Sequence, residues 1–221
     1  MLRIAIDGTA SAGKGSIAKG VARSLNIAYV DTGAMYRSIA LLVLESNKDC
    51  HNMEDVLSVL EGVSFDFIWN GDTLEVLLND RNVSSLIRTK EVGALASIVS
   101  VYPEVRAKLS EIQREYASSE SLVMDGRDIG TIIIPNAELK VFVDADVDER
   151  ARRRWAELQA KGETANVEEI ADDLRERDHR DRNRSIAPLK RADDAKLLDT
   201  TSLSIEQGIT EILASITSNF F

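Results

Sequence analysis

The sequence predicts an α/β protein with a central parallel sheet, on three observations. Short apolar runs alternate with helical stretches along most of the 221 residues, which is the pattern of parallel βα units. A glycine-rich loop joins the first apolar run to the first helical stretch. The alternation fails at about 63–100, which we predict to be an inserted antiparallel subdomain, so that the core of one domain comprises 1–62 and 101–221.

The first two βα units stand at the start of the chain. Apolar runs of strand length at Leu2–Ile6 and Ala28–Val30 are each followed by apolar residues at helical spacing. These patterns predict two strands, with helices at Ser16–Leu25 and Ala34–Glu45.

The inserted segment has the pattern of a hairpin. Apolar and polar residues alternate over 63–67, and Asn-Gly-Asp at 70–72 has the composition of a turn before the apolar Leu74–Val76. This combination predicts two antiparallel strands.

The second half of the chain returns to the βα order. Strands are expected at Leu122–Met124 and Lys140–Val143, each followed by an aspartate, as is typical where parallel strands end at functional loops. Helices at Asp148–Lys161 and Val167–Arg177 are expected to follow, then a strand at Lys196–Asp199 and a C-terminal helix.

Composition limits the class of protein. A net charge of -10 argues against a nucleic-acid-binding surface, although basic residues outnumber acidic ones between Arg150 and Arg191. The single cysteine, Cys50, excludes an internal disulfide, and the two histidines lack metal-site spacing. No apolar run has the length of a signal peptide or a membrane span. We expect a cytoplasmic protein with no protein-bound metal and no membrane or nucleic-acid partner.

The glycine-rich loop satisfies the phosphate-binding pattern G-x-x-x-x-G-K between a predicted strand and a predicted helix. Its backbone N–H groups and the helix N-terminus favour phosphate, and its lysine can reach the β and γ phosphates of ATP. The loop consists of Gly8, Thr9, Ala10, Ser11, Ala12, Gly13, Lys14, Gly15 and Ser16.

Gly15 stands where a Ser or Thr would bind Mg²⁺. We therefore expect Mg²⁺ to be held mainly by phosphates and water. The alternative for the whole loop is a glycine-rich turn that only caps a helix.

A GTPase is disfavoured by two failed motifs. Residues 47–50 and 125–128 resemble the guanine-reading and switch motifs of GTPases, but both fail at their last residue. A kinase for a small acceptor needs an anion pocket and mobile positive charge instead, and the chain has candidates for both.

Four segments together resemble the bacterial cytidylate kinase family: Gly8 to Ser16, Asp31 to Arg37, Asp125 to Thr131 and Arg177 to Arg184. They follow in order through nearly the whole chain. The resemblance implies a three-layer P-loop kinase fold in which the hairpin segment is the nucleoside-monophosphate (NMP) binding insertion and a short lid covers ATP. It also implies transfer of the ATP γ-phosphate to CMP or dCMP.

The lid would fall at about 153–164. Arg150, Arg152, Arg153 and Arg154 crowd one predicted helix, and Gly162 can act as a hinge. Arg153 is the ATP-binding candidate among them. The alternative is a solvated helix face paired with nearby glutamates.

The resemblance assigns the acceptor pocket residue by residue. Arg37 would grip the CMP phosphate beside Tyr36, and Arg177 with Asp181 would bind the ribose hydroxyls. The implied CMP-binding set is Thr32, Tyr36, Arg37, Ser97, Arg106, Arg127, Asp128, Arg177, Asp181 and Arg184. The implied catalytic set is Lys14, Arg37, Asp128 and Arg184.

Some of these residues have plainer alternatives. Thr32 has the chemistry of a helix N-cap, Ser97 could be an ordinary helix residue, and Arg177 with Asp181 could form an i,i+4 surface ion pair.

The expected reaction is an in-line phosphoryl transfer by a monomer whose partners are ATP, CMP and dCMP. The acceptor phosphate has a second pKa of about 6, so no strong general base is required, and Asp128 is expected to orient the acceptor. The alternatives are a kinase for UMP, AMP or shikimate, or a non-catalytic nucleotide-binding regulator.

Overall fold

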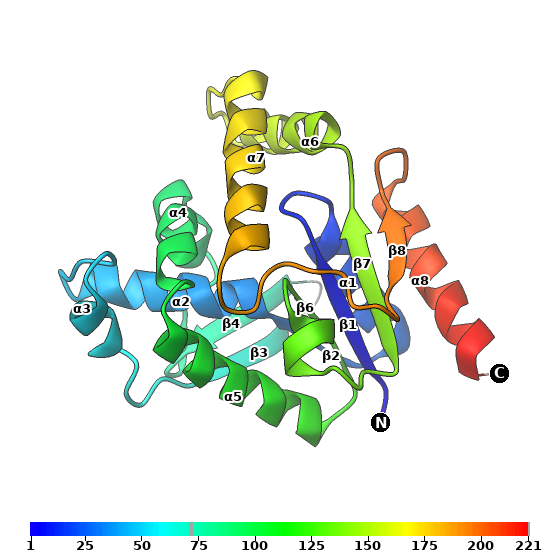
Figure 1. Cartoon of the computed structure of the whole chain (residues 1–221), viewed down its shortest axis with the longest axis horizontal. Coiled ribbons are helices and arrows are strands. Elements are labelled where there is room, and N and C mark those ends of the chain that lie inside the picture. Colours follow the sequence, from blue (N-terminus) through cyan, green and yellow to red (C-terminus); the bar gives the residue numbers. More distant parts are fainter. Residues whose placement is uncertain (71–72, 221) are drawn as a thin grey trace. The chain divides into compact units, whose positions relative to one another are not determined.

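The computed structural model describes residues 1–70 and 73–220 (Figure 1). The chain divides into two compact units. Unit 1 contains Met1–Tyr29 and Ser119–Phe221, and unit 2 contains Val30–Ser118.

A five-stranded sheet is built in the order β2-β6-β1-β7-β8. The pairs β1–β6, β1–β7 and β7–β8 are parallel. Its strands are short, and the middle three are almost wholly buried because apolar residues fill both faces. The strands are β1 (Arg3–Gly8), β2 (Ala28–Asp31), β6 (Leu122–Gly126), β7 (Leu139–Asp144) and β8 (Lys196–Asp199).

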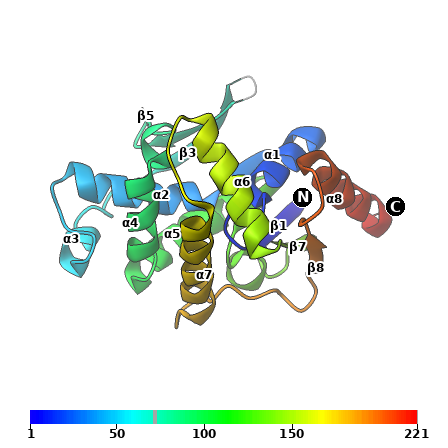
Figure 2. The same ribbon diagram turned by 90° about the horizontal axis from the view of Figure 1, so that it is seen from above.

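Two helices of unit 1 begin at residues whose side chains cap them. The Asp146 carboxylate accepts hydrogen bonds from the first N–H groups of α6, and Asn166 caps α7 in the same way. Helix α1 packs on β6 and α8, and α6 packs on α7 (Figure 2). The helices are α1 (Lys14–Leu25), α6 (Val147–Ala160), α7 (Val167–Asn183) and α8 (Ile205–Phe220), with a single π turn, η2 (Ile129–Ile133).

Unit 2 combines helices with a three-stranded antiparallel sheet in the order β3-β4-β5. In the predicted hairpin, Phe65 pairs with Leu78 and Phe67 with Val76. The strands are β3 (Phe65–Asn70), β4 (Thr73–Leu78) and β5 (Arg81–Asn82). The helices are α2 (Thr32–Glu45), α3 (Met53–Leu57), α4 (Lys90–Val99) and α5 (Pro103–Ser119), with a short 3₁₀ turn, η1 (Leu86–Arg88).

The predicted fold class is confirmed: a central parallel sheet with helices on both sides and a separate small antiparallel sheet. Every predicted strand and helix is present, but α7 continues six residues beyond the predicted end at Arg177. That extension is entirely polar, so it carries no apolar periodicity. No helix in the described ranges has the length and apolarity to cross a membrane.

The hairpin turn and the subdomain boundaries stay predictions. The predicted turn at 70–72 includes residues 71 and 72, which lie outside the described residues. Unit 2 contains all of 63–100 and extends beyond it at both ends, so the limits of the inserted subdomain are not fixed by this division, and neither are those of the lid.

Candidate functional site

The phosphate loop connects β1 to α1 within unit 1. Gly8 has a φ of 153°, and a Cβ atom added there would lie 1.9 Å from the Val143 carbonyl oxygen. Only glycine therefore permits β1 to run this close to β7 at the start of the loop. Thr9 donates its hydroxyl to Asp144 at 2.7 Å, which joins the loop to the carboxyl end of β7.

Lys14, the loop lysine, is buried and forms an ion pair with Asp125 at the end of β6. The Tyr29 hydroxyl donates to the other Asp125 oxygen at 2.6 Å. Asp125 thereby holds the lysine in place. That Lys14 binds the phosphates of ATP stays a prediction, and Asp125 and Tyr29 were not among the predicted site residues. The available signal was a carboxylate directly after a buried parallel strand.

Asp7, the last side chain of β1, is a second buried carboxylate in this region. It accepts hydrogen bonds from the Ile129 and Gly130 N–H groups, both at 2.8 Å, and so ties the π turn to β1. Burial raises the pKa of Asp7 to about 6, against the lowering effect of these two bonds and of Lys14.

Arg150 differs from the other arginines of α6, because its side chain is buried. Its guanidinium donates to the carbonyls of Ala10 in the phosphate loop, at 3.2 Å, and of Ala145, at 2.9 Å. It also forms an ion pair with Asp178 of α7 at 2.8 Å. Arg150 therefore joins the phosphate loop to both helices, a role that the sequence did not reveal.

The remaining α6 arginines make lighter contacts. Arg152 and Arg154 form i,i+3 pairs with glutamates of their own helix, which matches the alternative of a solvated face. Arg153, the predicted ATP-binding residue, pairs with Glu149 and donates to Thr200 and Thr201 near the end of β8.

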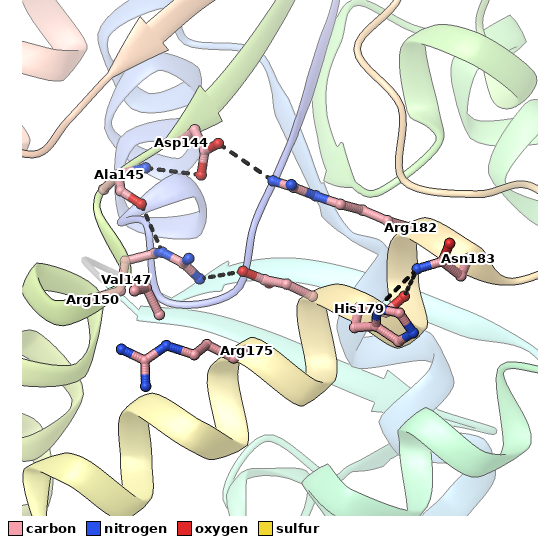
Figure 3. Close-up of a pocket in the computed structure, with 9 residues that line it drawn as sticks. Asp144, Ala145, Val147, Arg150, Arg175, His179, Arg182 and Asn183 are labelled. Atoms are coloured by element: carbon pink, nitrogen blue, oxygen red, sulfur yellow. Dashed lines mark hydrogen bonds and ion pairs between the residues drawn. The ribbon is translucent and has the colours of Figure 1, made fainter.

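A pocket of about 330 Å³ opens between the carboxyl end of β7, α6 and α7 (Figure 3). Arg182 points across it toward Asp144, at 3.6 Å, and Arg175 lies at its α7 wall. Three arginines and two aspartates thus line this pocket, and Arg150 links it to the phosphate loop through the Ala10 carbonyl. The lining residues are Asp144, Ala145, Val147, Arg150, Arg175, Asp178, His179, Arg182 and Asn183.

Unit 1 also contains five of the predicted acceptor residues. Arg127 pairs with Asp181 at 2.9 Å, and Arg184, the C-cap of α7, pairs with Asp128 at 3.5 Å. The structure thus brings these four together in two pairs. Sequence spacing suggested Arg177 as the ion-pair partner of Asp181 on its own helix, whereas Asp181 bonds to Arg127 from the loop after β6.

The charges around Arg127 and Asp181 favour the ionised form of both side chains. Burial would raise the pKa of Asp181, but Arg127, Arg177 and Arg184 outweigh burial and lower it. Burial would lower the pKa of Arg127, but Asp181 and other aspartates outweigh it and raise it. Both members of the pair remain ionised at neutral pH.

Unit 2 contains the other predicted acceptor residues. Asp31 caps α2 by accepting from the Ala34 N–H at 2.9 Å, and its second oxygen holds Arg37 at 2.9 Å. Asp31 is therefore the N-cap, and the alternative that Thr32 caps the helix is wrong; Thr32 is buried as the first residue of α2.

An arginine and an aromatic ring are stacked in the same unit. The Arg106 guanidinium lies 5.5 Å from the centre of the Tyr36 ring and donates to the Ser100 carbonyl at 3.3 Å. Ser97 lies half-buried on α4, and its carbonyl accepts from the Ser100 hydroxyl. Unit 2 thus presents two buried or half-buried guanidinium groups, on Arg37 and Arg106.

The described residues contain no group of three or more His, Cys, Asp or Glu arranged to hold a metal. Ser16, the first hydroxyl after Lys14, is exposed. The carboxylate paired with the loop lysine is that of Asp125. The structure thus places one oxygen-donor side chain of the kind that binds Mg²⁺, the Asp125 carboxylate, beside the loop lysine.

The chain closely matches proteins of one family along nearly its whole length. A family model described as cytidylate kinase matches residues 4–218. A cytidylate kinase of Bacillus cytotoxicus is 46% identical, covering 97% of this chain and 96% of its own. Cytidylate kinase 1 of Haemophilus influenzae is 44% identical, covering 96% of this chain and 92% of its own.

Solved structures show the same fold. An uncharacterized protein from Eubacterium ventriosum has a TM-score of 0.56 at 14% identity, with 99% of each chain covered. A shikimate kinase from Bacteroides thetaiotaomicron has a TM-score of 0.51 at 15% identity, with 98% of each chain covered.

Proposed function

The chain belongs to the cytidylate kinase family, and we propose that it transfers the γ-phosphate of ATP to CMP or dCMP, giving CDP or dCDP and ADP. The match of the family model to residues 4–218 carries this proposal. The phosphate loop with its buried lysine supports it independently. The shikimate kinase shares the fold alone, and neither a kinase for UMP, AMP or shikimate nor a non-catalytic regulator is favoured.

ATP is proposed to bind at the phosphate loop, Gly8 to Ser16, with Arg153 contributing from α6. Lys14 would leave Asp125 and bind the β and γ phosphates, since a phosphate chain offers it more charge than one carboxylate. Mg²⁺, held mainly by phosphate and water oxygens, supplies charge neutralisation on the transferring group.

The proposed acceptor residues belong to both units. In unit 2, Arg37 would grip the CMP phosphate, with Thr32 and Tyr36 beside it. Ser97 and Arg106 would bind the cytosine base. In unit 1, Asp128 and Arg184 would complete base recognition, Arg127 would bind phosphate, and Arg177 with Asp181 would bind the ribose hydroxyls.

Cytosine recognition needs both acceptors and donors. The base has an amino donor at N4 and acceptors at N3 and O2, so a carboxylate such as Asp128 and guanidinium groups such as Arg184 complement it. Asp128 and Arg184 already form an ion pair within unit 1. The base would therefore replace part of this ion pair with its own hydrogen bonds to the two side chains. Asp128 thus orients the acceptor, and Lys14, Arg37, Asp128 and Arg184 form the proposed catalytic set.

We further propose a monomeric enzyme of the cytoplasm whose partners are nucleotides and not nucleic acid. The net charge of -10 supports the last point, and the one cysteine fits a reducing compartment.

An acceptor screen tests the proposed function. ADP production from ATP and Mg²⁺ is measured with CMP, dCMP, UMP, AMP and shikimate supplied separately, through an NADH-coupled readout. We expect turnover with CMP and dCMP and little with the others. Preference for another acceptor would overturn the assignment of cytosine as the base. No ADP production with any acceptor would overturn the proposed kinase activity.

A further inference from the structure

The phosphate loop lacks the side-chain hydroxyl that commonly follows its lysine. Gly15 occupies this position, where Ser or Thr binds Mg²⁺ in other phosphate loops. Ser16, the next residue with a hydroxyl, lies one position further along and is exposed on α1.

A buried hydroxyl from another strand lies beside that position. A Cβ atom placed on Gly15 would be 3.6 Å from the Tyr29 hydroxyl oxygen and 3.9 Å from Asp125 Oδ2. Tyr29 is 2% exposed, and its ring reaches this point from β2. The phenol oxygen therefore occupies the neighbourhood that a Ser or Thr side chain at residue 15 would enter.

The Tyr29 hydroxyl and Lys14 share one carboxylate. The hydroxyl donates to Asp125 Oδ1 at 2.6 Å, and the lysine pairs with Oδ2. The two donors hold opposite oxygens, so the hydroxyl fixes the plane of the carboxylate and directs Oδ2 toward the phosphate loop. Because the hydroxyl and the lysine bond to different oxygens, the bond from Tyr29 does not depend on the one from Lys14.

We infer that Tyr29 is a positioning residue for phosphoryl transfer and that its hydroxyl stands in for the missing hydroxyl at residue 15, by orienting Asp125 toward the metal that accompanies ATP. The inference rests on the proposed binding of ATP at this loop. Partners that orient a metal-side carboxylate commonly account for about 10-fold or more in metal affinity.

Calorimetry with a non-hydrolysable ATP analogue, without any acceptor, tests the inference. The measured quantity is the factor by which Mg²⁺ tightens analogue binding. In Tyr29→Phe, which keeps the buried ring, we expect this factor to fall by about 10-fold, with little change in binding without Mg²⁺. Tyr116→Phe is the matched control, since it removes a hydroxyl that donates to the Phe65 carbonyl in unit 2, and its factor should equal that of the wild type.

A second substitution tests the replacement itself. The 3.6 and 3.9 Å separations are ordinary contacts, so the Cβ atom of Gly15→Ser is accommodated. In Tyr29→Phe, adding Gly15→Ser should restore much of the Mg²⁺ factor. A wild-type factor in Tyr29→Phe, or no recovery in a folded double variant, would overturn the inference.

Two further outcomes remain distinguishable. If Tyr29→Phe does not fold, the single variant Gly15→Ser tests the inference. A change of less than about twofold in its Mg²⁺ factor supports the inference. A gain of about 10-fold would show that no hydroxyl in the wild type performs this role and would overturn the inference. If the wild type binds no analogue, the proposed ATP site fails instead.

Discussion

Two buried carboxylates at the ends of neighbouring strands have different roles. Asp125 is neutralised by Lys14 and receives a hydroxyl from Tyr29. Asp7 receives two backbone N–H groups and stabilises the start of the π turn. Burial acts on Asp7 strongly enough to raise its pKa to about 6, so Asp7 couples the stability of the fold to pH.

Asp7→Asn tests that coupling. Because the pKa is raised on folding, from 3.8 to about 6, the folded state binds more protons than the unfolded state between these values. The wild type should therefore lose stability relative to the variant as pH rises from 4 to 6, by about 1.4 kcal/mol for each pH unit between the two pKa values.

Urea unfolding at pH 4, 5, 6 and 7 measures this difference. The side-chain NH₂ group introduced by Asp7→Asn cannot accept a backbone N–H as the carboxylate does, so the variant also loses stability. This loss does not depend on pH. Parallel pH curves for the two proteins would contradict the prediction.

At the scale of elements, the α6–α7 pair is attached to the phosphate loop by charge as well as by apolar packing. Ala151, Ala171 and Leu174 form a small buried cluster with Ala10 of the loop. Arg150 adds a hydrogen bond to that loop and an ion pair with Asp178. Any movement of α6 and α7 would therefore act directly on the phosphate loop, where ATP is proposed to bind.

Arg150→Met is expected to destabilise unit 1 by about 3–5 kcal/mol, because it leaves Asp178 buried without its cation. The matched control on the same helix is Arg152→Met, whose pair with Glu149 is exposed. It should change stability by no more than about 0.5 kcal/mol.

Urea unfolding of both variants at neutral pH measures the contrast. Equal losses from Arg150→Met and Arg152→Met would show that the buried pair contributes no more than a surface pair.

At the scale of the whole molecule, the proposed ATP-binding residues all belong to unit 1, whereas the proposed acceptor residues come from both units. The phosphate loop belongs to unit 1, whereas Arg37 belongs to unit 2. A substitution in unit 2 should consequently weaken use of the acceptor without weakening the binding of ATP.

Arg37→Met should raise the KM for CMP by about 10- to 100-fold, the effect of losing one hydrogen bond to a charged group. Binding of the non-hydrolysable ATP analogue should be unchanged. The exposed Arg88→Met in the same unit is the control, with a normal KM expected.

Steady-state kinetics with varied CMP, together with calorimetry of the analogue, provides both readouts. An unchanged KM for CMP would remove Arg37 from the acceptor site. Equal weakening of CMP and the analogue would contradict the division between units.

Much of the fold was predicted from patterns of residues that are close together in the sequence. The strand, loop and helix around Lys14 are contiguous, so their geometry follows from neighbouring residues. Elements with weak local signals were missed: β5 has two residues, too few for alternation, and the end of α7 is wholly polar. The start of α5 did carry a signal, a proline at its first position.

The sequence by itself determined the phosphate loop, the order of βα units and the resemblance to one kinase family, because each is a pattern of adjacent or regularly spaced residues. Only the tertiary structure decided which side chains meet. Lys14 and Asp125 are 111 positions apart and face each other because β1 and β6 pair in parallel with Ile6 opposite Asp125. Arg150 reads as one more arginine of a basic helix, and only packing determined that this arginine is buried against the phosphate loop. Pairing and burial depend on the whole chain, so no local pattern reveals them.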